Sequence, residues 1–335
     1  QRQEPAHAMT QNAEPSRNAD QAVADAMPAN WVDRWAPRAT RPYLRLMRAD
    51  RPIGSWLLMW PCWWSAALAT QATGTLQDGR PLGTFPDPWF LFLFALGAIV
   101  MRGAGCTYND FVDRDIDGSV ARTRSRPIPS GAVSPKAAFA FAVLLSLIGF
   151  LVLIQFNAFT IGLGIASLGI IAVYPFMKRI TYWPQIVLGL AMNWGALMGW
   201  AAVTGSLALA PIVLFAGAIA WTIGYDTIYA HQDREDDALL GLKSTALKFG
   251  ARTKPWLWLF YGITALSFIG AGLLAGLGVG FYLVIGFAIW HLFRQITRLD
   301  IDNGARCLAL FRSNRDLGII VFIAIIAGSL GPPLL

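Results

Sequence analysis

The chain has 335 residues, of which 55% are hydrophobic and only 14% are charged, and its mean hydropathy is +0.47. This composition excludes an ordinary soluble globular protein, which carries more charge and fewer apolar residues. The formal net charge of +7 does not indicate nucleic acid, because no basic segment interleaved with aromatic residues is present. An all-α, polytopic membrane protein in contact with membrane lipid is predicted.

The first 37 residues are rich in Ala, Asn, Gln and Pro and contain few apolar side chains. We therefore expect residues 1–37 to be disordered, and residues 1–8, which precede Met9, to be a remnant ahead of the native start. The segment is too acidic for a mitochondrial presequence, and no apolar run begins before residue 50, so no cleavable signal peptide is expected. Residues 38–335 are predicted to form a single transmembrane domain.

Nine apolar runs have the length needed to cross a bilayer as helices. Glycines within or beside them are interpreted as sites of close helix packing, namely Gly103, Gly105, Gly189, Gly195 and Gly199. The predicted spans cover residues 53–71, 89–107, 134–155, 158–176, 183–203, 210–230, 254–275, 277–295 and 316–333.

Basic residues support this count of nine. All of the 27 Lys and Arg residues except Arg80 fall in segments that nine crossings place on one side of the membrane. Because Lys and Arg accumulate in cytoplasmic loops, the N-terminus and the active-site face are predicted to be cytoplasmic and the C-terminus external. The bacterial inner (plasma) membrane is the expected location, with the mitochondrial inner membrane as the alternative.

An acidic cluster follows the second span in the segment YNDFVDRDIDGSVARTRSRP, residues 108–127. On a helix, positions four apart share a face, so Asn109, Asp113 and Asp117 form one stripe. The segment DRDIDG resembles the start of an EF-hand loop, but the twelfth position of that loop requires Glu and is Arg124 here. Calcium binding of that kind is excluded.

A second acidic cluster follows the sixth span, in the segment YDTIYAHQDREDD. Asp233 and Asp237 again lie four residues apart, and Asp226 lies seven residues earlier on nearly the same side. Like charges at this spacing repel, and carboxylate and amide oxygens are the ligands that Mg²⁺ prefers. The two clusters, both at cytoplasmic ends of spans, predict a magnesium site.

Cationic side chains accompany both clusters on the same face. Cations beside metal-bound carboxylates are expected where a polyanion such as diphosphate binds between them. A solvated acidic loop, a cation transporter and a structural membrane scaffold are the alternatives; a transporter predicts charges in the middle of spans. The accompanying residues are Arg122, Arg126, Lys178, Arg179, Lys243 and Lys248, with Tyr174 one turn before Lys178.

With these motifs the sequence resembles the UbiA family of intramembrane aromatic prenyltransferases, from about Tyr43 to the end of the chain. The family motif NDxxDxxxD is matched by Asn109, Asp110, Asp113 and Asp117, and the motif DxxxD by Asp233 and Asp237. Further similar segments are RADRPIG, LMRGAGCTYND, RTRSRPIPSG and YPFMKRITYWPQ. The resemblance implies nine transmembrane helices around a central cavity and two Mg²⁺ ions that bridge both motifs to diphosphate.

The resemblance also implies the reaction and the role of each residue. The expected reaction transfers a polyprenyl group from polyprenyl diphosphate to the carbon ortho to the hydroxyl of 4-hydroxybenzoate, in ubiquinone biosynthesis, or to another aromatic acceptor. The chain length of the donor is not readable from the sequence. The implied roles are catalysis by Asp113, Asp117, Asp233 and Asp237; metal binding by the same four and Asn109; diphosphate binding by Arg122, Arg126, Tyr174, Lys178 and Lys243; and acceptor binding by Arg51 and Arg179.

Overall fold

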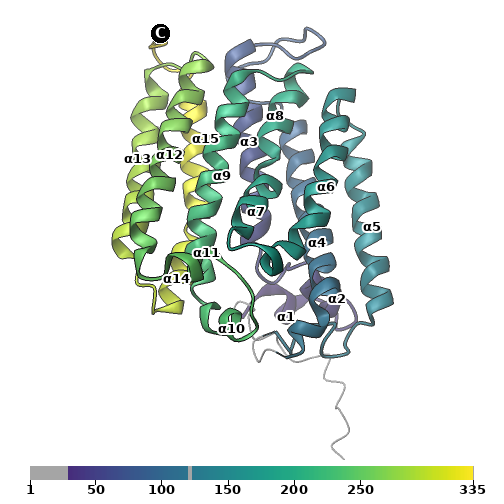
Figure 1. The fold of residues 1–335 in the computed structure, drawn as a ribbon. Helices are drawn as coiled ribbons and strands as arrows, with labels where there is room; N and C mark the ends of the chain where they lie inside the picture. The colour runs from purple at the N-terminus through teal and green to yellow at the C-terminus, as the bar shows by residue number, and fades with distance from the viewer. Residues whose placement is uncertain (1–28, 120–122, 335) are drawn as a thin grey trace, which may run out of the picture.

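The computed structural model describes residues 29–119 and 123–334, and every element in these ranges is helical apart from two isolated β-bridges. Long helices run side by side, and short helices cover one end of the bundle (Figure 1). The long helices are α3 (Ile53–Thr73), α4 (Pro88–Asp117), α5 (Pro135–Leu153), α6 (Ala158–Ile180), α7 (Pro184–Asn193) with α8 (Gly195–Thr204), α9 (Leu209–Ala230), α12 (Thr253–Leu274), α13 (Val279–Arg298) and α15 (Asn314–Ala327).

The short helices lie in the connections and before the first long helix. The expected disorder of residues 1–28 falls outside the described residues, whereas the end of that segment is folded, because a helix begins at Trp31. The short helices are α1 (Trp31–Trp35), α2 (Arg41–Leu46), α10 (Arg234–Leu239), α11 (Thr245–Phe249), the 3₁₀ helix η1 (Gly250–Arg252) and α14 (Gly304–Arg312).

Each of the nine predicted spans corresponds to a helix or a helix pair, but not every one has the character of a membrane span. Of the described helices, α3 is long enough but contains four tryptophans and Pro61, and α15 has only 14 residues. A multi-pass, all-α membrane fold is therefore confirmed, while the count of nine stays a prediction. Within the described residues, seven segments are long and apolar enough to cross a membrane: α4, α5, α6, α7 with α8, α9, α11 through α12, and α13.

Polar caps and prolines set where three of these helices begin. The Asp87 side chain accepts a hydrogen bond from the backbone N–H of Trp89 at 2.8 Å, and Ser134 caps α5 in the same way at 3.2 Å. Asn157 caps α6 at 3.0 Å. Proline follows the cap in α4 and α5, where its missing N–H costs no hydrogen bond. These starts are readable from the sequence alone.

Close helix packing depends on several of the glycines identified from the sequence. A Cβ at Gly199 of α8 would collide with the backbone carbonyl of Cys62 in α3, and one at Gly103 would press on Met47. Gly189 and Gly195 are similarly enclosed, whereas Gly105 has open space beside it and faces a cavity. The packing interpretation is therefore confirmed for four of the five glycines and is wrong for Gly105.

The chain direction brings the two acidic motifs to one end of the bundle. In Figure 1, the C-terminus lies at the end opposite to α1, α2 and α10. Helices α4 and α6 both finish on the α1 side, and residues at their ends are in contact, since Lys178 of α6 reaches Asp113 of α4 at 2.6 Å. Helix α9 also ends on this side, next to α10, so both acidic motifs lie at the same end of the bundle.

Candidate active site

The first acidic motif lies on the last three turns of α4. The helix continues unbroken to Asp117, so the four-residue spacing predicted from the sequence becomes a real stripe. The Asn109 amide donates a hydrogen bond to Asp113 Oδ2 at 3.3 Å, and Asp110, Asp113 and Asp117 are all buried. Buried carboxylates require cationic or hydrogen-bonding partners.

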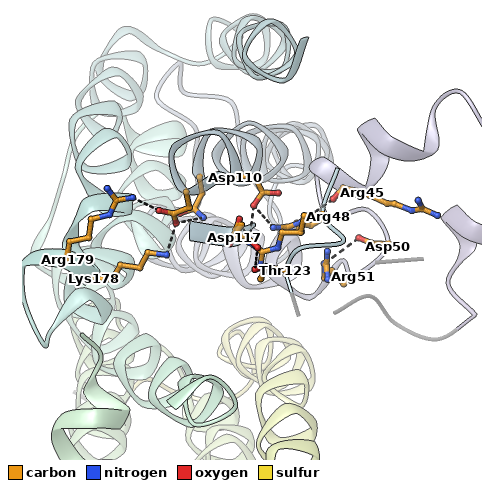
Figure 2. A network of polar contacts seen from close by, with 12 residues as sticks. Arg45, Arg48, Asp50, Arg51, Asp110, Asp117, Thr123, Lys178 and Arg179 are labelled. Carbon is orange, nitrogen blue, oxygen red and sulfur yellow. Dashed lines mark hydrogen bonds and ion pairs between the residues drawn. The ribbon is translucent and has the colours of Figure 1, made fainter. Parts of the chain in front are cut away.

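Cations from the end of α6 meet Asp113 on one side. Lys178 Nζ lies 2.6 Å from Asp113 Oδ2, and an Arg179 guanidinium nitrogen lies 2.8 Å from Oδ1. Figure 2 shows Lys178 and Arg179 approaching the carboxylates from one side and Arg48 from the other. Both oxygens of Asp113 are thus held by separate positive charges.

Arginines from two other segments neutralise the remaining carboxylates of α4. Arg126 lies 2.8 Å from Asp117 Oδ2 and 3.3 Å from Asp110 Oδ1, so one guanidinium bridges both carboxylates. Arg48 approaches Asp110 Oδ1 to 2.6 Å. Its backbone has φ of 60°, a left-handed conformation that is uncommon for residues other than glycine and that often marks a functional constraint.

The second acidic motif faces the first across a polar cavity of about 250 Å³. The turn after α9 and the start of α10 carry Asp233 and Asp237, whose backbones are joined by a 2.8 Å hydrogen bond. The cavity therefore collects most of the site residues that the sequence predicted. The acidic and amide residues in its walls include Asn109, Asp117, Asp226, Asp233 and Asp237, and the cationic and hydroxyl residues include Arg126, Lys178, Lys243 and Tyr174.

A larger cavity of about 470 Å³ continues from the polar one into the bundle. Most of its lining is apolar and comes from α3 to α8, including Phe94, Leu153 and Ile165. The two cavities share wall residues, among them Asn109, Arg126 and Tyr174, so they adjoin one another. A ligand with a polyanionic head and a long hydrocarbon tail fits such a pair of cavities.

The two arginines predicted to bind the acceptor occupy different places. Arg51 lines the larger cavity, as its predicted role requires. Arg179 instead pairs with Asp113 and lines neither cavity, so the geometry gives no support for its contact with an acceptor in the larger cavity. Arg122, predicted to bind diphosphate, lies outside the described residues.

Arg48 and Arg102 were not identified from the sequence as site residues, and Asp110 was matched to the first motif without a role of its own. Arg48 and Asp110 form the short ion pair described above, and Arg102 lies within α4 with its guanidinium against Gly54. Arg102 Nε is buried without a hydrogen-bond partner, and Arg102 lines the larger cavity. A lone arginine inside an apolar run is a recognisable signal, since intramembrane charges are costly and mark functional positions.

The donor groups fit magnesium, although they do not yet converge on one point. Among the described residues, no three His, Cys, Asp or Glu side chains are close enough together to hold a metal ion. The carboxylates of α4 are instead paired with Arg48, Arg126, Lys178 and Arg179. Residues with carboxylate or amide oxygens, the ligand type that Mg²⁺ requires, line the cavity from both motifs. The cavity has room for a hydrated cation. Metal binding would replace some of these ion pairs.

Comparison with known proteins supports a single family. Residues 58–326 match the model of the UbiA prenyltransferase family. The chain is 49% identical over 290 residues to the mitochondrial 4-hydroxybenzoate polyprenyltransferase of Aedes aegypti, covering 86% of this chain and 64% of that relative. It is 48% identical over 300 residues to the human protein of the same name, covering 88% of this chain and 77% of that one.

Solved structures show the same fold. A UbiA homolog from Aeropyrum pernix K1, solved in its apo form, matches with a TM-score of 0.67 at 25% identity, over 82% of this chain and 98% of that chain. A UbiA homolog from Archaeoglobus fulgidus bound to GPP and Mg²⁺ matches with a TM-score of 0.62 at 20% identity, over 86% of this chain and 98% of that chain.

Proposed function

Since the chain belongs to the UbiA prenyltransferase family, we propose that it transfers a polyprenyl group from polyprenyl diphosphate to the carbon ortho to the hydroxyl of 4-hydroxybenzoate, a step of ubiquinone biosynthesis. The observation that carries this proposal is the polar cavity, rich in carboxylates and cations, that opens into a larger apolar cavity. The names of the relatives from Aedes aegypti and human support 4-hydroxybenzoate as the acceptor.

Magnesium is the proposed cofactor of the polar cavity. Asn109, Asp113 and Asp117 from α4, with Asp233 and Asp237 from the second motif, would hold it. When bound, Mg²⁺ would neutralise the charge that develops on the departing diphosphate. The Archaeoglobus fulgidus homolog, which was solved with GPP and Mg²⁺, supports this assignment by analogy of fold.

The chain's own cations promote departure of diphosphate from the prenyl carbon. Arg126, Lys178 and Lys243 line the polar cavity together with Tyr174, whose hydroxyl can donate a hydrogen bond. Positive charges and hydrogen-bond donors beside the negative charge that develops on diphosphate stabilise the transition state. Breaking of the carbon–oxygen bond leaves an allylic cation at the junction of the two cavities.

The apolar cavity supplies the second requirement, exclusion of water from that cation. Its lining by apolar side chains from α3 to α8 accommodates the hydrocarbon tail and the acceptor ring. Of the arginines that line this cavity, we assign Arg51 and Arg102 to the acceptor carboxylate, because Arg48 and Arg126 pair with Asp110. Arg179 pairs with Asp113 and lines neither cavity. The ring then attacks the cation, and aromaticity returns when a proton is lost.

Product analysis tests this function directly. Purified protein incubated with Mg²⁺, 4-hydroxybenzoate and prenyl diphosphates of several lengths is expected to yield ring-prenylated 4-hydroxybenzoate, identified by mass spectrometry. Prenylation only of another aromatic acceptor would replace the acceptor assignment. Absence of any prenylated product, together with Mg²⁺ flux in proteoliposomes, would favour a cation transporter instead.

We expect Lys243→Ala to weaken the use of prenyl diphosphate about tenfold to hundredfold, because one charge-assisted hydrogen bond contributes about 1.5–3 kcal/mol. Lys243 lines the polar cavity, where its ammonium donates to the Ile180 carbonyl at 3.1 Å. The measurement is KM for prenyl diphosphate at saturating acceptor.

A matched control for Lys243 is available a few residues away. Lys248 lies over the Trp183 ring at 4.8 Å and lines neither cavity. Lys248→Ala should retain the parent KM. Equal KM values in both variants would remove Lys243 from the diphosphate site.

The protein is multi-pass, and we propose that its active-site face is the cytoplasmic or matrix side. The mitochondrial names of the relatives favour the mitochondrial inner membrane over the bacterial plasma membrane, the reverse of the preference drawn from composition.

Thr181→Cys and Ser206→Cys, at opposite ends of the α7–α8 segment, should react with an impermeant maleimide from opposite sides. The three native cysteines are buried and give a low background; labelling of both variants from one side would contradict this topology.

A further inference from the structure

Asp226 occupies a position that no other described carboxylate shares. It lies one turn before the end of α9 and lines both the polar cavity and the larger apolar cavity. Among the described residues, Asp117, Asp233 and Asp237 reach only the polar cavity, and Asp110 reaches only the apolar one. Asp226 therefore faces the junction at which the proposed function places the reacting atoms.

The partners of Asp226 also set it apart. Asp110, Asp113 and Asp117 each have a guanidinium or ammonium group within 3 Å. No described Lys or Arg lies within ion-pair distance of Asp226. Its nearest polar neighbour is the Gln185 side chain, and Arg102, Asp233 and Asp237 lie at longer range. Gln185 Oε1 accepts a hydrogen bond from Thr245 N at 3.2 Å, which leaves its amide nitrogen to face Asp226.

These differences matter for proton transfer. A carboxylate held directly by cations is a weak proton acceptor, because its neighbours stabilise the ionised form. A carboxylate in an enclosed cavity with one neutral amide neighbour keeps an oxygen for a substrate proton and binds that proton more readily. The carboxylates of α4 are suited to cations, and Asp226 is suited to a proton.

We propose that Asp226 accepts the phenolic proton of the acceptor during prenyl transfer. This assignment rests on the proposed function. After the bond between the prenyl carbon and diphosphate breaks, the ortho carbon of the ring forms a bond to the resulting allylic cation, and the phenolic proton moves to Asp226. The resulting dienone becomes aromatic when Asp226 returns this proton to the oxygen and the ring C–H proton leaves with diphosphate or water.

The first test separates catalysis from binding. Asp226→Asn keeps the shape of the side chain and removes its basicity, and we expect kcat with 4-hydroxybenzoate to fall about 100-fold or more. Direct binding of radiolabelled geranyl diphosphate in Mg²⁺ should stay within about twofold of the parent. Asp300→Asn, a change at an exposed loop carboxylate, should leave both quantities unchanged.

The second test uses an acceptor whose phenol has already lost its proton, so that no proton acceptor is needed. The phenol of 3-nitro-4-hydroxybenzoate is already ionised at neutral pH and has one free ortho carbon. The parent enzyme should use it slowly, because the nitro group weakens the ring as a nucleophile. We nevertheless expect the Asp226→Asn rate, divided by the parent rate, to be at least about tenfold higher with the nitro acceptor than with 4-hydroxybenzoate. Asp226→Glu should retain part of the rate with both acceptors.

Three outcomes would overturn the assignment. Equal rate ratios for the two acceptors would show that Asp226 acts structurally, and a shift of the Mg²⁺ concentration needed for geranyl diphosphate binding would make it a metal ligand. An unchanged kcat would exclude any role. Failure of the parent protein to prenylate 4-hydroxybenzoate would instead count against the proposed function, and the product assay detects that separately.

Discussion

Asp113→Asn and Asp233→Asn are each expected to lower prenyl transfer by about 10³-fold or more while leaving a folded protein. One carboxylate comes from α4 and the other from the segment before α10, so each represents one motif. Loss of one anionic ligand would weaken the metal-diphosphate unit, and a thousandfold loss corresponds to about 4 kcal/mol of transition-state stabilisation. Rates at saturating substrates, with circular dichroism as the check of folding, measure the effect.

Asp115 provides the matched control for these variants. It belongs to the same helix and the same acidic run, but its side chain is 86% exposed and lies 3.8 Å from Arg114 at the surface. Asp115→Asn should therefore retain near-parent activity. A near-parent rate in Asp233→Asn would contradict the assignment of the second motif to the metal.

The double variant of Asp113 and Asp233 addresses whether the motifs act together. If both serve one metal-diphosphate unit, the double variant should be scarcely slower than either single variant, as expected for residues that function as a unit. Multiplied effects would indicate two independent sites.

Removal of divalent metal is expected to abolish activity completely and reversibly. Because Lys178, Arg179, Arg126 and Arg48 already pair with the carboxylates of α4, the metal-free protein keeps these charges neutralised. The fold should therefore survive EDTA, and the rate should return when Mg²⁺ is added in excess. The unfolding midpoint and the prenylation rate, each measured before and after chelation, check the two parts of this prediction.

A comparison of metals sharpens the chelation experiment. The donor set consists of carboxylate and amide oxygens, so Mg²⁺ should restore activity better than Zn²⁺, which favours nitrogen and sulfur ligands. Activity that persists in EDTA would overturn the metal assignment and reopen the transporter interpretation.

The helical stripe was predictable from the sequence because its geometry is local. Positions four apart on a helix always share a face, so the relation of Asn109, Asp113 and Asp117 needed no knowledge of other helices. The starts of α4, α5 and α6 were predictable for the same reason, since each depends on a cap within three residues. The failure of α3 to qualify as a membrane span also has a local cause, because its four tryptophans lower its hydropathy.

Contacts between distant segments were not predictable in this way. Arg179 was expected at the acceptor from the family resemblance, but its guanidinium pairs with Asp113, as does the ammonium group of Lys178. Arg48 pairs with Asp110, which lies 62 positions away in the sequence. The left-handed backbone of Arg48 was not predictable either, because this conformation is usually found at glycine or asparagine. Gly105 resembles the packed glycines in sequence and differs only in its surroundings.

The sequence by itself determined the all-α membrane class, the clustering of basic residues between the apolar runs and the two acidic motifs. These properties follow from local composition and from the 3.6-residue period of the helix. The tertiary structure decided which cation pairs with which carboxylate, that a polar and an apolar cavity adjoin, and that Asp226 faces both. Such relations arise only when helices far apart in the chain pack together, because the distance between two side chains then depends on every helix between them.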